Sequence, residues 1–118
     1  MLRIGLNPYG LTYHLGLQGM GTPRANPAGR RLEGFIAIAT ELKAEVIEIF
    51  DPWLRALDDD ALRALKDRLD SLGMVPVVSA GLNMMGAMES AFRSARALGA
   101  GVIRLGLSPV LCGARAEQ

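Results

Sequence analysis

The sequence has very little of the chemistry on which many catalytic and metal-binding sites depend. It contains one cysteine, Cys112, and one histidine, His14, which lie far apart in the chain. An intrachain disulfide is therefore excluded, and there is no paired-cysteine zinc motif. A nucleophilic cysteine needs a base beside it, and nothing in the sequence places His14 near Cys112. We expect a protein of the reducing cytoplasm in which Cys112 is not catalytic.

An excess of charge of one sign and a long hydrophobic run are missing as well. The 13 basic and 12 acidic residues leave a formal net charge of +1, and the basic residues are scattered. This balance gives no reason to expect binding to nucleic acid or to an acidic membrane surface. The beginning of the chain does not look like a signal peptide, and no window approaches the ~18 apolar residues that span a bilayer. We therefore expect a soluble protein with neither a nucleic acid nor a membrane as its partner.

What the sequence does have is a hydrophobic and repetitive pattern. Half of its 118 residues are hydrophobic, a composition typical of one globular domain. Three segments align without gaps, beginning at residues 41, 71 and 97, which is 30 and then 26 residues apart. Each joins the end of a helix to a short apolar run, and the interval between them is the size of one strand-and-helix unit.

The helices predicted before these runs each carry one apolar stripe at helical spacing. The stripes are Leu32, Phe35, Ile36, Ala39 and Leu42 in the first, Leu62, Leu65, Leu69 and Leu72 in the second, and Met88, Ala91, Phe92, Ala95 and Leu98 in the third. The three aspartates at 58–60 suit the start of the second helix. Gly73 and Gly99 are placed to end the second and third helices, whereas the first helix ends at Lys43 and Ala44 without a glycine.

Strands are predicted over residues 2–7, 45–50, 74–80 and 101–107. Three of them are nearly continuous apolar runs, which are typical of parallel strands covered on both faces. Alternation of strands and helices predicts an α/β fold with a parallel sheet and right-handed crossovers. Four such units match the front half of a parallel β/α barrel of the TIM type, so we expect residues 1–118 to form one partial barrel domain. Residues 8–29 form a long loop after the first strand, at the end of the sheet where α/β proteins bind ligands.

Glu48 is the sharpest candidate for a functional residue. It interrupts an apolar strand, and a buried carboxylate is costly unless it is paired. The repeat alignment places Arg104 at the same position of the fourth strand. If both side chains point into the barrel, they either line a substrate site or form a structural ion pair. Both interpretations remain open.

Other polar and aromatic residues follow the predicted strand ends. They are Asn7, Tyr9 and His14 after the first strand, Asp51 after the second and Asn83 after the third. Such side chains suit a hydroxyl-rich ligand, which needs hydrogen bonds and a ring to stack on. With Glu48 and Arg104 they form the predicted substrate site, and loop packing, or a simple turn at Asp51-Pro52, is the alternative. Ser79 is interpreted as a small core residue. The sequence identifies no catalytic residue and no metal ligand.

Four stretches together resemble the xylose-isomerase-like TIM barrels, the sugar phosphate isomerase/epimerase superfamily. They are the opening strand from Arg3 to Asn7, the run Val46-Ile-Glu-Ile49, and the segments SLGMVPVVSAGL and SARALGAGVIRLGL. The resemblance covers nearly the whole chain, but only the front half of such a barrel. It implies an enzyme that isomerises or epimerises a sugar or polyol by moving a proton next to a carbonyl through an enediolate. It also implies a divalent metal ion whose ligands come from later strands, outside this chain.

On this interpretation we expect the 118 residues alone to be inactive. Two alternatives remain. One is a half-barrel that associates with itself through its two open sheet edges. The other is a non-catalytic protein that binds a carbohydrate at the pocket of the first loop.

Overall fold

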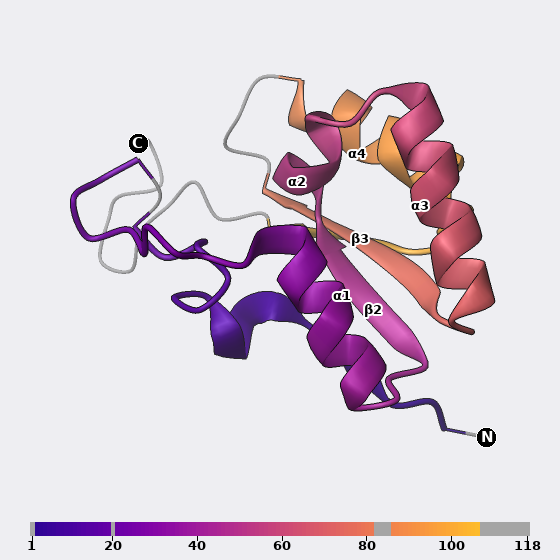
Figure 1. Ribbon diagram of the computed structural model, residues 1–118. Helices are drawn as coiled ribbons and strands as arrows, with labels where there is room; N and C mark the ends of the chain where they lie inside the picture. The colour runs from indigo at the N-terminus through magenta and orange to yellow at the C-terminus, as the bar shows by residue number, and fades with distance from the viewer. Residues whose placement is uncertain (1, 20, 82–85, 107–118) are drawn as a thin grey trace.

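The computed structural model describes residues 2–19, 21–81 and 86–106 (Figure 1). Its elements are β1 (Gly5–Leu6), the 3-10 helix η1 (Pro8–Leu11), α1 (Arg31–Glu41), β2 (Val46–Phe50), α2 (Asp51–Arg55), α3 (Asp59–Ser71), β3 (Val75–Gly81), α4 (Ala87–Leu98) and β4 (Ile103–Gly106). The four strands form one sheet in the order β1-β2-β3-β4, and every neighbouring pair is parallel. The predicted α/β class with a parallel sheet is therefore confirmed.

The long helices α1, α3 and α4 all pack on one face of the sheet. Every second strand residue points to that face, including the buried Ile47, Ile49, Val78 and Ala80, and these join the apolar sides of the three helices in a single core. The residues between them point to the opposite face, here called the open face. On it lie Gly5, Val46, Glu48, Phe50, Val77, Ser79, Val102 and Arg104. In the part of the chain that the structure describes, the long helices cover one face only, and the open face is covered in part, since Ser79 on it is 1% exposed.

The three repeats end their helices in the same way. The amides of Ala44, Met74 and Ala100 donate to carbonyls five residues back, at 2.9, 3.0 and 2.8 Å. This Schellman pattern needs a left-handed residue just before that amide. Gly73 and Gly99 take this conformation with φ of 69° and 68°, as predicted, and Lys43 takes it with φ of 55° in the first repeat.

Replacing Lys43 by glycine should raise the free energy of unfolding by about 1 kcal/mol. A side chain in the left-handed region costs ~1–2 kcal/mol, part of which glycine returns through its greater freedom in the unfolded chain. Urea denaturation followed by circular dichroism measures the change. The reverse substitution Gly73→Ala is the matched control, because its Cβ would meet no atom within 4 Å, and it should lose a similar amount. A Lys43→Gly variant no more stable than the parent would contradict the assignment.

The predicted apolar stripes are correct along most of each helix and wrong at four positions. Leu42 and Leu72, which precede the left-handed residues of the first two repeats, are 63% and 39% exposed, whereas Leu98 at the same place in the third repeat is buried. Met88 and Phe92 are 45% and 58% exposed. These two line an apolar groove of about 330 Å³ between α4 and β4, at the edge of the sheet.

The long loop after β1 is ordered by contacts within itself over its described residues. Leu15 is fully buried in the core, and the Asn26 side-chain amide donates to the Tyr13 carbonyl at 3.0 Å. The chain doubles back so closely that a Cβ on Gly29 would lie 2.5 Å from the Cα of Gly16. Only glycine fits at Gly29, and the loop can therefore fold back against Gly16 before it enters α1.

Candidate functional site

An ion pair crosses the open face of the sheet. Arg104 on β4 donates from Nε to Oε1 of Glu48 on β2, at 2.7 Å, across the intervening strand β3. The Glu48 side chain is 13% exposed and that of Arg104 is 49% exposed. The hydrogen bond that Arg104 donates to Glu48 raises the pKa of Arg104 above its ordinary value, and the guanidinium stays charged, as it does in proteins generally. The ion pair that the sequence left open as one of two alternatives is therefore present.

The repeat alignment predicted that Glu48 and Arg104 lie at the same level of their strands. In the structure they do not. Glu48 lies beside Val77 on β3, whereas Arg104 lies beside Ser79, two residues farther along that strand. The alignment is wrong by one residue from β2 to β3 and by one more from β3 to β4. A slip of one residue turns a side chain to the other face of the sheet. The two slips add up to two residues, which returns Arg104 to the face of Glu48.

Tyr9 stacks on this ion pair from the end of β1. The Arg104 Cζ lies 4.7 Å from the centroid of the Tyr9 ring, within the range of a cation–π interaction. Tyr9 belongs to η1, and the Asn7 Oδ1 caps this short helix by accepting from the Tyr9 amide at 3.0 Å. Residues that follow β1 and residues of β2 and β4 thus converge on one region of the open face.

Two buried oxygens beside the ion pair have no hydrogen-bond partner among the described residues. They are Oε2 of Glu48 and Oγ of Ser79. Ser79 is 1% exposed and lies on the open face, between the strands that carry Arg104 and Phe50. Leaving a buried polar atom unpaired costs about 1–3 kcal/mol. Each of these two oxygens therefore has hydrogen-bonding capacity that no described residue uses.

A shallow depression of about 190 Å³ adjoins Glu48 on the side of β1. Its lining consists of Gly5, Leu6, Asn7, Val46, Glu48 and Val77. The exposed Asn7 and the half-buried Glu48 give it polar groups, and the two valines give it an apolar floor. Of the predicted site residues, the structure thus brings together Asn7, Tyr9, Glu48 and Arg104.

His14 is not part of this cluster in the structure. It is exposed in the loop, and its backbone carbonyl accepts from the Arg30 amide at 3.1 Å, which helps to close the loop. Asn83 and Cys112 lie outside the described residues. Ser79, interpreted from the sequence as a small core residue, is buried as expected. Its hydroxyl also lies beside Arg104 on the open face, and the alternation of faces along β3 is the pattern that could have placed it there.

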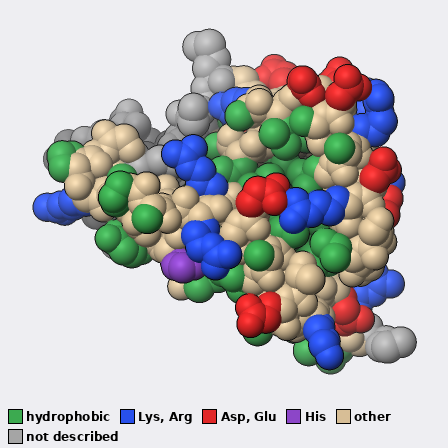
Figure 2. Space-filling model, viewed as in Figure 1, with side chains coloured by type: hydrophobic (Ala, Val, Ile, Leu, Met, Phe, Trp, Pro, Cys, Tyr) green, Lys and Arg blue, Asp and Glu red, His purple; other side chains and the backbone are tan. Residues whose placement is uncertain are grey.

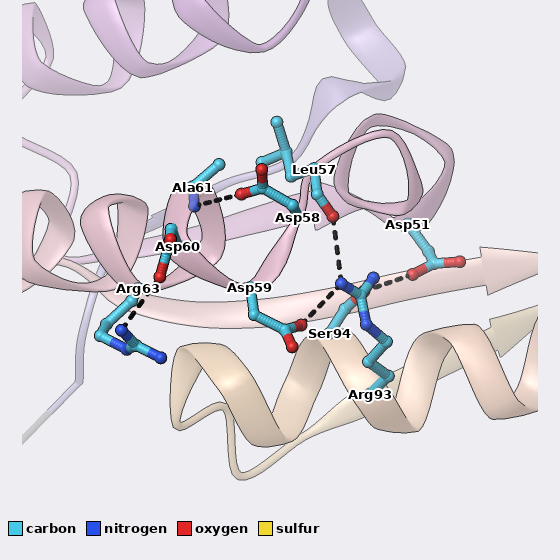
Figure 3. Close-up of polar contacts among 9 residues, drawn as sticks. All are labelled: Asp51, Leu57, Asp58, Asp59, Asp60, Ala61, Arg63, Arg93 and Ser94. Carbon is cyan, nitrogen blue, oxygen red and sulfur yellow. Dashed lines mark hydrogen bonds and ion pairs between the residues drawn. The ribbon is translucent and has the colours of Figure 1, made fainter.

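Asp51 lies away from the cluster, between α2 and α4 (Figure 3). Its carboxylate is fully buried, with Oδ1 accepting from the Ser94 hydroxyl at 2.8 Å and Oδ2 from Arg55 at 3.1 Å. The turn predicted at Asp51-Pro52 is wrong, because these residues begin α2. We infer that Asp51 holds α2 against α4.

Figure 3 also shows how Arg93 joins α4 to the start of α3. The Arg93 guanidinium donates to the Leu57 carbonyl at 3.1 Å and to Asp59 at 2.9 Å. On the face drawn in Figure 2, acidic and basic side chains intermingle over the helices, in keeping with the near-neutral composition. The helix side of the sheet is therefore a supporting layer, and the polar cluster lies on the opposite, open face.

No protein-family model and no curated protein matches this chain. No group of three or more histidine, cysteine, aspartate or glutamate side chains gathers within the described ranges. Nor does any helix there have the length and apolarity to cross a bilayer.

Proposed function

We propose that this chain is one half of a parallel β/α barrel, whose open sheet face forms half of the barrel interior. The packing of α1, α3 and α4 on one face supports this, because helices surround such a barrel on the outside only. The ion pair supports it further. Arg104 lies two strands away from Glu48 and two residues farther along the sheet. Because strands lie ~4.8 Å apart and rise ~3.3 Å per residue, the line that joins the two residues runs about 35° off the perpendicular to the strands.

That angle is the one a TIM barrel requires. Its strands tilt by about 36°, and side chains from alternate strands meet in one layer across the interior. Glu48 on β2 and Arg104 on β4 fit one such layer, offset by one residue for each strand crossed. The line between them is then perpendicular to the barrel axis.

We further propose that this interior binds a sugar or polyol, and that the intact barrel isomerises or epimerises it. The carrying observation is the pair of buried, unpartnered oxygens, Glu48 Oε2 and Ser79 Oγ, beside the charged Arg104. The carboxylate accepts from a ligand hydroxyl, the guanidinium donates to a carbonyl or anionic oxygen, and the Tyr9 ring offers an apolar surface. These residues bind and orient the substrate. The described residues gather no set of ligands for the divalent metal that the sequence resemblance implies, so no step of the reaction is assigned to it.

Isothermal titration of the 118-residue chain with a panel of sugars, sugar phosphates and polyols, with and without a divalent metal, tests this proposal. Glu48→Gln should weaken binding about 10- to 100-fold, since it removes a charged hydrogen-bond acceptor. Glu33→Gln is the matched control, because Glu33 also pairs with an arginine, Arg68 at 2.6 Å, but on the helix surface. Binding by no member of the panel, or equal affinity in Glu48→Gln and the parent, would refute the proposal.

A further inference from the structure

We propose that a second copy of this chain completes the barrel, with β4 of each copy beside β1 of the other across a two-fold axis. This rests on the half-barrel part of the proposed function and names the partner. Among the described residues, β1 and β4 each pair with one strand only. Two sheets of four strands give the eight strands at which a parallel β/α barrel closes, and a closed two-fold arrangement is the commonest symmetry of oligomers.

The charges of the open face are self-complementary in this dimer. One layer of the barrel takes four side chains, one from every second strand. Two copies fill it in the order Glu48, Arg104, Glu48, Arg104. Each carboxylate then lies between two guanidinium groups, and each guanidinium between two carboxylates. Within one copy the pair uses Arg104 Nε and Glu48 Oε1 at 2.7 Å. The buried Glu48 Oε2, which has no partner among the described residues, accepts from the other copy's Arg104 with one lone pair and keeps the second for a ligand hydroxyl.

The depression beside Glu48 gives that second arginine its path. Within one copy Arg104 reaches Glu48 across β3, and on the other side of Glu48 lies β1. The open-face residue of β1 is Gly5, which has no side chain, and it lines the depression of about 190 Å³ together with Glu48. From β2 to β4 the layer of side chains shifts by one residue for each strand crossed. If the same shift continues from β2 across β1 to the partner's β4, the partner copy's Arg104 lies beside Gly5. The arginine crosses β1 there and reaches Glu48 over the same two-strand span.

Apolar side chains at the two edges match in the same register. Ile4 precedes β1 and is 75% exposed, and alternation places it on the helix side with Leu6. At the other edge, Ile103 and Leu105 on the helix side of β4 line the apolar groove of about 330 Å³. The register that sets Arg104 beside Gly5 sets Ile103 beside the partner copy's Ile4. Dimer formation therefore covers apolar groups that are exposed at both edges.

Sedimentation velocity on the 118-residue chain at 1–100 µM tests the proposal, and a dimer is the expected species. Glu48→Arg and Arg104→Glu each place four like charges in the layer and should weaken the dimer at least about 100-fold, because a buried charge then lacks a partner. Arg63→Glu is the matched charge reversal on α3, at a side chain that is 71% exposed, and should leave the dimer intact. Circular dichroism confirms that each variant is folded.

Mixing the two monomeric variants separates contacts between copies from contacts within one copy. In a mixed dimer, Glu48→Arg supplies two arginines and Arg104→Glu supplies two glutamates, so every contact between copies joins opposite charges. We expect dimers to return in the equimolar mixture only. Ile4→Lys tests the edge of the sheet and leaves the charges of the interior layer unchanged. It should weaken the dimer about tenfold or more, because it places a charge on the edge that the partner's β4 would cover. Leu42→Lys, at an exposed aliphatic side chain at the C-cap of α1, is its control.

A parent chain that stays monomeric at 100 µM overturns the proposal. So do charge-reversed variants that dimerise like the parent, or a mixture that stays monomeric. The proposed function fails separately: a monomer that binds a sugar refutes only the dimer, whereas a dimer that binds no member of the panel refutes only the substrate class.

Discussion

Replacing Phe35 by alanine is expected to lower the free energy of unfolding by about 3–5 kcal/mol, the usual cost of removing a buried aromatic ring. Phe35 lies on the sheet side of α1 and is fully buried. Its ring centroid is 6.0 Å from that of Trp53 on α2, which in turn stands edge-on to Phe50 at 6.2 Å. The ring thus joins α1, α2 and the end of β2. Since a domain of this size is stable by only about 5–15 kcal/mol, much of that stability depends on it.

Phe92→Ala is the matched control for this substitution. Phe92 is also on a helix, but 58% of it is exposed, so the same change should cost less than about 1 kcal/mol. Urea denaturation of both variants at one protein concentration, followed by circular dichroism, gives the comparison. Equal losses at Phe35 and Phe92 would contradict the assignment of the core to one face of the sheet.

The alternation of helices and strands could be predicted because each repeat carries the same local pattern. An apolar stripe, a left-handed stop and an apolar run follow one another three times, and each depends on neighbours within one turn or one strand. The helix α2 could not be predicted in this way. Asp51-Pro52 suits a turn as well as the first turn of a helix. The contact that accompanies the helix joins Asp51 to Ser94, 43 residues away.

The polar site could be predicted in part for a similar reason. A charged residue within an apolar strand is conspicuous, so Glu48 could be singled out from the sequence, with an ion pair to Arg104 as one of two alternatives. Their relative level could not be predicted, because aligned repeats carry no information about the stagger of neighbouring strands. The contact of Tyr9 with Arg104 depends on the path of the chain after β1 and had no local pattern. Ser79 was missed because a hydroxyl in an apolar strand is compatible with either face.

Removing the Asp51 carboxylate is the second change with a large expected effect. Asp51→Ala should lower the free energy of unfolding by about 2–3 kcal/mol, because the buried Ser94 hydroxyl then lacks its partner. A fully buried ion pair that loses one member costs ~3–5 kcal/mol. The loss here is smaller because the Arg55 side chain is 33% exposed and water can solvate its charge. Asp60→Ala is the control, since Asp60 is 89% exposed in its pair with Arg63 and should cost less than about 0.5 kcal/mol.

A double-mutant cycle with Ser94→Ala assigns this loss to the contact between α2 and α4. The two substitutions together should cost about 1 kcal/mol less than the sum of the single changes, since each one removes the same hydrogen bond. The isosteric Asp51→Asn variant then separates packing from binding. It keeps the volume of the side chain and lies on the helix side of the sheet, so the sugar affinity and the dimer of the parent should both be retained. A folded Asp51→Asn variant with weakened sugar binding would instead return Asp51 to the substrate site, where the sequence pattern had placed it.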